Sequence, residues 1–254
     1  MFSVVALPAA LAHLSPRLVQ VGSLEPDATG GPAQAVPFGF EELDQLLPDG
    51  GVLRGSVVEL AIAGSGLGTT LGLAAVRAFQ AREAASFGTR VKPWCAFVDA
   101  SSTLYAPGVA ASGVALERLL VVRPPVEAVS RVALKLAESG VFELVVVDLL
   151  GTLGQALDFP LARFGRVVRR LSMAVDGTNK SVLLLTDARV ERALPLPVAQ
   201  RIELTRSAID RLSARIAKDR RGRVSAQRPL VWTRGSAVLE PAASEGTADV
   251  RKLA

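Results

Sequence analysis

The sequence of 254 residues contains one cysteine, one histidine and few aromatic residues. The single cysteine, Cys95, excludes an internal disulfide, which favours a protein of the reducing cytoplasm. With His13 as the one histidine, a cluster of Cys and His ligands for a metal ion is excluded. A Ser-His-Asp triad would have to recruit this residue from the N-terminus, so we expect neither kind of site.

Aromatic residues make up 5% of the chain and hydrophobic residues 50%, so we expect a large core built from aliphatic side chains. No apolar run approaches the ~18 residues that a membrane-spanning helix requires. Residues 1–14 are apolar but have no basic start, which argues against a secretory signal. We therefore expect a cytoplasmic protein without a membrane partner.

Acidic residues are scarce between positions 201 and 234. The segment holds ten basic residues against three acidic ones, whereas the whole chain has a net charge of +5. A basic field of this kind favours a nucleic acid or an acidic protein surface as partner. A solvated basic surface is the alternative. The basic residues are Arg201, Arg206, Arg211, Arg215, Lys218, Arg220, Arg221, Arg223, Arg228 and Arg234.

Composition also predicts the domain boundaries. Residues 22–35 are rich in Gly, Pro and small polar residues and are typical of a linker, so we assign 1–35 to an N-terminal arm and linker. Residues 240–254 have the composition of a disordered tail. Residues 36–239 are then one core domain.

Within this core, apolar strands alternate with amphipathic helices. A parallel α/β sheet is the expected result, because continuous apolar strands need helices on both faces. After Pro197 the pattern changes to strands joined by short turns, which predicts an antiparallel extension. Expected helices are 38–51, which the turn Pro48 to Gly51 ends, 69–85, 126–140 and 161–175. Expected strands are 56–63, 93–100, 118–124, 142–150 and 181–188, with 93–100 and 118–124 both buried, and 198–206 and 211–233 are expected to hold strands joined by short turns.

Three of the predicted strands end in polar or glycine-rich residues. They are the stretch 63–70, Asp99 with Ser101 and Ser102, and Asp148. Ligands of open α/β sheets bind outside the carboxyl ends of the strands. These ends are therefore the candidate binding site.

The stretch "AIAGSGLGTTLG" (61–72) resembles a phosphate-binding loop, whose pattern is G-x-x-x-x-G-K-[ST]. When Thr69 takes the hydroxyl position, the lysine position is Gly68, and Leu67 and Ile62 replace the two glycines. An ordinary strand-to-helix turn is the alternative, although helix N-termini bind anions through their free N–H groups. The nucleotide-binding candidates are Gly64, Gly66, Gly68, Thr69, Thr70 and Asp148, and we expect no bound cofactor.

The order of these pieces resembles the bacterial recombinase RecA over residues 36–235. The resemblance lies in "AVPFGFEELDQLLPDGGVLRGSVVELAIAGSGLGTTLGLA" (35–74), "CAFVDASSTLYAPGVAASGV" (95–114) and "SGVFELVVVDLLGTL" (139–153). It implies a RecA-like α/β core, with a mostly parallel twisted sheet, flanking helices and an antiparallel C-terminal extension. It also places Asp148 at the magnesium-side position of the second nucleotide motif.

The sequence departs from RecA at the positions that serve ATP hydrolysis. Besides the altered phosphate loop, Ser101 stands where the family has a catalytic glutamate, and Asp187 stands at the carboxamide that senses ATP. The DNA-binding loop of the family is shortened to about 189–197. The resemblance therefore implies a RecA fold that does not act as a recombinase or as an enzyme.

RecA-like proteins with a degenerate ATP loop and this "GFEELDQLLPDGG" entry resemble the ImuA family. That resemblance implies a non-enzymatic accessory of damage-induced (SOS) mutagenesis and translesion synthesis. Its implied partners are RecA, the Y-family polymerase homologue ImuB and an error-prone C-family polymerase. The alternatives are an ATP-binding RecA/Rad-class ATPase and a SulA-like cell-division inhibitor.

In RecA assemblies, basic residues of one subunit cap the nucleotide of the next. Lys218 and Arg220 fall on these two positions within "ARIAKDRRGRV" (214–224). We predict that they contact RecA together with Arg221 and Arg223, so that the chain caps a RecA filament. A solvated basic hairpin is the alternative.

Arginines at three positions of the helix predicted over 161–175 form a second basic group. Arg163, Arg166 and Arg170 share one helix face and are candidates for weak contact with DNA phosphates. A solvated helix face is the alternative.

Overall fold

The computed structural model describes residues 35–63, 67–82, 84–86, 89–151, 157, 164–190, 195–206 and 211–231. All of them belong to the second of two compact units, Met1–Ala33 and Gln34–Ala254. His13, nearly all of the predicted arm and the predicted tail lie outside the described residues. The predicted domain boundaries therefore stay predictions.

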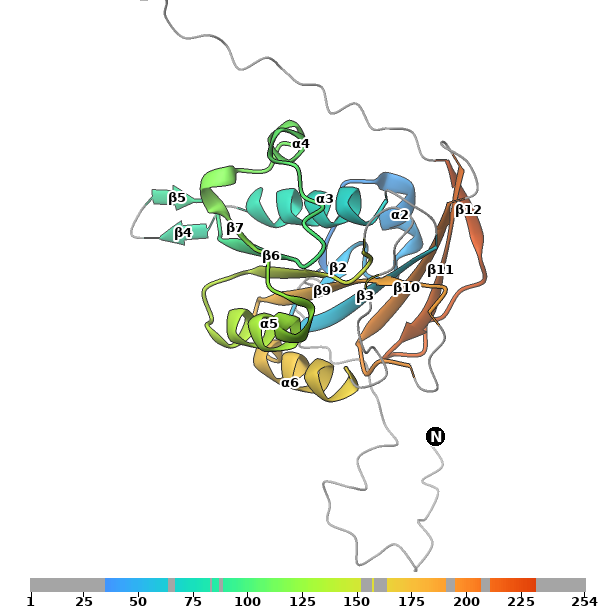
Figure 1. The fold of residues 1–254 in the computed structure, drawn as a ribbon. Coiled ribbons are helices and arrows are strands. Elements are labelled where there is room, and N and C mark those ends of the chain that lie inside the picture. The colour runs from blue at the N-terminus through green and yellow to red at the C-terminus, as the bar shows by residue number, and fades with distance from the viewer. Residues whose placement is uncertain are drawn as a thin grey trace, which may run out of the picture. The chain divides into compact units, whose positions relative to one another are not determined.

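An eight-stranded sheet forms the centre of this unit, in the order β12-β11-β10-β3-β9-β8-β6-β7 (Figure 1). The strands from β10 to β7 in this order run parallel, and β11 and β12 continue the sheet with antiparallel pairs. Their bounds are β3 Ser56–Ala63, β6 Cys95–Asp99, β7 Leu119–Val122, β8 Leu144–Asp148, β9 Ser181–Asp187, β10 Gln200–Arg206, β11 Arg211–Asp219 and β12 Arg228–Val231.

Helices cover both faces of the sheet, with α3 and α4 on one side and α5 and α6 on the other (Figure 1). The helices are α2 Glu41–Leu46, α3 Gly68–Gln80, α4 Ala106–Ala111, α5 Val129–Glu138 and α6 Gly165–Val175, and short 3-10 turns occupy Leu116–Arg118 and Val126–Ala128. Among the described residues, no helix has the length and apolar character needed to cross a membrane.

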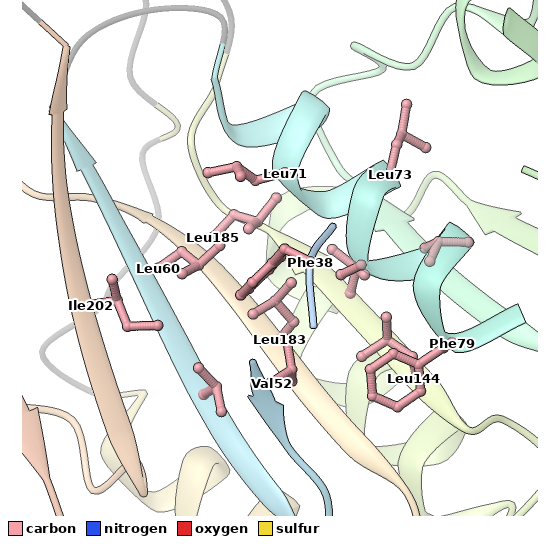
Figure 2. Close-up of a cluster of buried hydrophobic side chains, with 14 of the residues drawn as sticks. Phe38, Val52, Leu60, Leu71, Leu73, Phe79, Leu144, Leu183, Leu185 and Ile202 are labelled. Atoms are coloured by element: carbon pink, nitrogen blue, oxygen red, sulfur yellow. The ribbon is translucent and has the colours of Figure 1, made fainter. Parts of the chain in front are cut away.

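A separate apolar core lies on each face of the sheet. On the α3 face, Phe38, Phe79 and Leu183 are fully buried among side chains from the sheet and from α3 (Figure 2). On the other face, Val168 and Leu171 of α6 pack with the strands and with α5. Burying each large aliphatic side chain contributes roughly 1.5–3 kcal/mol, so the two cores hold the layers together.

Two small antiparallel pairs accompany the main sheet. One joins β1 (Ala35–Val36) to β2 (Val52–Leu53), and the other joins β4 (Ala84–Ser86) to β5 (Thr89–Val91). The first pair depends on Gly51, because a Cβ atom there would lie 2.2 Å from the carbonyl oxygen of Val36. The sequence did not predict either pair.

The predicted α/β class and the antiparallel extension after Pro197 are confirmed. Two local predictions were wrong. The helix expected over 69–85 ends at Gln80, because residues 84–86 pair as a strand instead. The strand expected to be buried at 118–124 is β7 at the edge of the sheet, where Leu120 and Val121 are exposed.

Candidate functional site

The carboxyl edge of the sheet, where β3, β6, β8 and β9 end at Ala63, Asp99, Asp148 and Asp187, contains the strand ends selected from the sequence. Asp99 and Asp148 lie side by side in register on β6 and β8. The helix that follows β6 packs into the core on the α3 face, whereas the helix that follows β8 packs into the opposite core. The pair therefore sits at a topological switch point, the usual ligand position in open α/β sheets.

Asp99 holds the loop that follows β6. Its fully buried carboxylate accepts hydrogen bonds from the backbone N–H groups of Thr103 (2.8 Å) and Leu104 (3.1 Å) and from the Thr103 hydroxyl. Arg123 completes the set with an ion pair of 3.2 Å. These contacts satisfy the carboxylate, so its role in this structure is to order the loop.

Asp148 has a different environment, because its carboxylate accepts a hydrogen bond from the Leu150 N–H at 3.0 Å but forms no ion pair with a described residue. Burial raises the pKa of this carboxyl from 3.8 to about 6, against the lowering effect of that hydrogen bond, and the charge of Asp99 raises it further. A fraction of the molecules therefore carries a neutral Asp148 at mildly acidic pH.

Gly68 begins α3 at the position where a phosphate loop has its lysine. A Cβ atom on this glycine would lie 2.0 Å from Cδ1 of Leu150 and 3.3 Å from Cδ1 of Ile62. Leu150 thus occupies the space through which a lysine side chain would have to leave the backbone. Thr69 is half-buried and Thr70 is exposed in the first turn of the helix, and Gly64 and Gly66 lie outside the described residues.

Asp187 ends β9, next to β3, and is bound by an arginine of its own loop. The Arg189 guanidinium donates to both carboxylate oxygens, with the closest contact at 2.7 Å. This hydrogen bonding, partly opposed by burial, holds the pKa of Asp187 below its usual value. The aspartate is therefore an ionised acceptor, a different group from the neutral carboxamide that RecA resemblance implies at this position.

Two further side chains of this region are not nucleophiles or bases. Cys95 begins β6, at the end of the strand opposite to Asp99, and burial raises the pKa of its thiol to about 12, so the thiol is neutral at physiological pH and is not a nucleophile. Ser101, at the position of the family's glutamate, has a buried hydroxyl oxygen with no hydrogen bond in the described structure. The described cations beside the aspartates, Arg123 and Arg189, are each paired with one of them.

The basic residues of 214–224 lie at the opposite end of the sheet, the amino edge, where β3 and β10 begin and antiparallel β11 ends. Lys218 pairs with Arg201 at the start of β10, and the Arg220 N–H donates to the carbonyl of Ala199 at 2.8 Å. With eight residues in β3 and about 3.3 Å per residue, the two edges are about 25 Å apart. The two sets of candidate residues therefore form separate surfaces.

The side chains of three of the four predicted partner-binding residues contact their own chain. The Lys218 ammonium donates to the Leu196 carbonyl at 2.9 Å, and burial lowers the pKa of this lysine. Arg221 and Arg223 bind Asp49. The Arg220 side chain is exposed and forms no hydrogen bond or ion pair with a described residue, so it is the member best placed to meet a partner.

The predicted DNA-contacting arginines are described in part. Arg166 is exposed on α6, which begins at Gly165, and Arg163 lies outside the described residues. Arg170 is exposed as well and forms an ion pair of 2.9 Å with Glu138 of α5. Contact with DNA stays a prediction that rests mainly on Arg166.

The family of this chain follows from its similarity to known proteins. The family model described as "RecA N-terminal domain" matches residues 20–159, more than half of the chain. The chain belongs to this family. The RecA-like α/β fold predicted from the sequence is thereby confirmed, with its mostly parallel sheet, flanking helices and antiparallel strands near the C-terminus.

Several curated RecA proteins are distant relatives of this RecA-family chain. Protein RecA of Bordetella avium is 31% identical over 170 residues, which cover 62% of this chain and 46% of that protein. Protein RecA of Deinococcus radiodurans is 32% identical over 168 residues, which cover 61% of this chain and 44% of that protein. Protein RecA of Brucella anthropi is 28% identical over 201 residues, which cover 73% of this chain and 53% of that protein. The chain spans about half the length of the curated relatives it matches.

Several residues of the RecA-family chain were not singled out from its sequence. Leu150 was read only as the end of an apolar strand, and Asp49 only as part of a turn. Arg189 and Arg123 lie 2 and 24 positions from the aspartates that they bind. Only the short spacing of Arg189 carries a local signal; the other contacts arise from tertiary packing.

Proposed function

We propose that this RecA-family chain is a non-catalytic, cytoplasmic accessory of SOS mutagenesis and translesion synthesis. Its partners would be RecA, the Y-family polymerase homologue ImuB and, through ImuB, an error-prone C-family polymerase. Membership of the RecA family supports a role alongside RecA. The observation that carries the proposal is the filling of the lysine position at Gly68 by Leu150, because a chain with this loop lacks the charge that neutralises nucleotide phosphates.

The proposed mode of action is one-sided docking on RecA. RecA-like subunits associate head to tail, and such heterologous contacts use two different surfaces of each subunit. Here the basic surface at the amino edge is retained, with Arg220 exposed, whereas the nucleotide surface at the carboxyl edge is altered. A chain of this kind accepts one RecA neighbour and offers no nucleotide site to the next, so it limits or caps the filament.

A pull-down of RecA with the full chain tests this function directly. RecA would be offered with and without single-stranded DNA and a slowly hydrolysed ATP analogue. We expect capture to be strongest with both, and the variant Lys218→Ala/Arg220→Ala to lose most of it. Arg228→Ala removes an exposed arginine of β12 and serves as the matched control. Undiminished capture by the double variant would sink the docking mode.

Calorimetric titration with ATP separates the proposal from the ATPase alternative. The chain retains Thr69 and Thr70 at the start of α3, so a nucleotide site without the lysine is the rival to be tested. We expect no measurable heat of ATP binding by the isolated chain in the presence of Mg²⁺. Saturable binding with a micromolar dissociation constant would favour the ATPase.

A further inference from the structure

The turn that follows β11 is held by two aspartates from different parts of the chain. Arg223 donates to Asp49 through Nη1 at 3.0 Å and through Nη2, and Nη2 also donates to Asp219 at 2.9 Å. Arg221 adds a contact of 3.4 Å to Asp49. Asp49 lies in the turn after α2, far away in sequence, so these contacts hold the turn after β11 against the turn after α2.

This cluster differs from an ordinary surface ion pair in its burial and geometry. The side chains of Asp49 and Asp219 are 5% and 0% exposed, and Arg223 is 33% exposed. Hydrogen bonding to Asp49 raises the pKa of Arg223, with a smaller contribution from Asp219. A two-point contact between guanidinium and carboxylate fixes orientation as well as distance. The turn is therefore held in one geometry.

The residue displayed by this turn is Arg220. Its backbone is fixed by the N–H bond to Ala199, and its neighbour Arg221 donates its own N–H to the Asp219 carboxylate at 2.6 Å. The Arg220 side chain lines an open pocket of about 310 Å³ whose other walls come from residues 55–57, from the end of α6 with Asp176, and from residues 197–199. Met173 of α6 stands at the same pocket with 79% of its surface exposed.

Arginine and methionine are enriched in protein interfaces, and a pre-ordered surface loses less entropy on binding. The exposed Arg220 side chain forms no ion pair with a described residue, Asp176 at the same pocket included, so its cation is available to an anionic group of a partner. We propose that Asp49 and Arg223 are positioning residues for a docking surface of Arg220 and Met173, which receives an anionic group beside an apolar side chain of a RecA-family subunit. The inference rests on the function proposed above.

Binding of the full chain to RecA filaments on single-stranded DNA, measured by biolayer interferometry, tests this assignment. Arg220→Ala should weaken binding about tenfold or more, and Met173→Ala by a smaller factor. Asp49→Asn keeps the size of the side chain but removes its charge, and should weaken binding several-fold. Asp49→Glu should restore most of the affinity, and Arg228→Ala should bind as the wild type does.

The double variant Asp49→Asn/Arg220→Ala separates positioning from general stabilisation. If Asp49 acts through Arg220, its replacement changes binding little once Arg220 is gone. An equal loss in both backgrounds would show a structural role only and would overturn the inference. Undiminished binding by Arg220→Ala, with wild-type binding present, would overturn it while leaving the proposed function intact. Absence of wild-type binding would overturn both.

Discussion

Gly68 stands where the phosphate-loop pattern has the lysine that neutralises nucleotide phosphates. The sequence predicted the missing lysine, because a motif position can be read directly. It did not predict that Leu150, 82 positions later, fills the vacated space, because that contact depends on the pairing of β8 with its neighbours. The loss of the lysine charge was thus visible in the sequence, whereas the position of Leu150 against Gly68 required the structure.

The substitution Gly68→Ala tests this closure. The new Cβ atom would lie 2.0 Å from Cδ1 of Leu150, the end of a half-buried side chain that has to shift, so we expect the free energy of unfolding to fall by no more than about 1 kcal/mol. In a Leu150→Ala background the same substitution should be neutral or stabilising by up to ~1 kcal/mol, since alanine favours helix over glycine. Urea unfolding of the four proteins measures the cycle. A similar loss in both backgrounds would refute the steric account.

Asp148 predicts a specific pH dependence of stability. Its pKa of about 6 in the folded chain exceeds the ordinary 3.8, so the folded state binds the proton more tightly than the unfolded state. The stabilisation that comes from this tighter proton binding is fully present below pH ~4 and is lost as the pH rises through 6. Each unit of pKa difference corresponds to about 1.4 kcal/mol of stability.

Replacement of this carboxyl by an amide removes the titration. Asp148→Asn should therefore be more stable than the wild type by on the order of 1–3 kcal/mol at pH 8, with the difference shrinking toward pH 4. Chemical unfolding across this pH range provides the measurement. A constant difference between the two proteins from pH 4 to pH 8 would contradict the assignment.

At the scale of elements, the continuous apolar strands were predictable and their neighbours were not. β3, β8 and β9 matched the sequence because both of their faces are covered, which leaves a run of aliphatic residues. β7 has a similar sequence but lies at the edge, since strand order depends on the crossover connections. The alanine-rich stretch after Gln80 has helical propensity, and strand pairing overrides it.

The sheet face at β3 and β10 holds a buried ion pair that stabilises the packing of these strands. The Glu59 carboxylate, fully buried on β3, accepts hydrogen bonds from Thr186 (2.7 Å) and Arg201 (3.1 Å). Arg201→Ala should lower the free energy of unfolding by about 2–4 kcal/mol, because a buried carboxylate loses its ion-pair partner. Arg215→Ala is the matched control: Arg215 pairs with Glu203 at a half-exposed site and should cost less than about 1 kcal/mol. Equal effects in thermal or urea unfolding would refute the distinction.

For the molecule as a whole, the proposed function depends on the separation of two surfaces. The sequence located residues for both, but it could not place them at opposite edges of one sheet, because that follows from the antiparallel pairing of β11 with β10. The edges lie about 25 Å apart along an eight-residue strand. One end retains a basic turn held by Asp49, and at the other Leu150 lies against Gly68, the lysine position of the phosphate-loop pattern.

This polarity leads to the most direct test of one-sided docking. RecA filaments would be assembled with a slowly hydrolysed ATP analogue on short and on long single-stranded DNA, at equal total RecA concentration. The amount of fluorescently labelled chain bound at saturation would then be measured for each DNA length. One-sided docking predicts that the bound amount follows the number of filament ends, so short filaments bind more chain per RecA subunit. Binding in equal proportion to RecA subunits on both DNA lengths, or no binding to either, would contradict it.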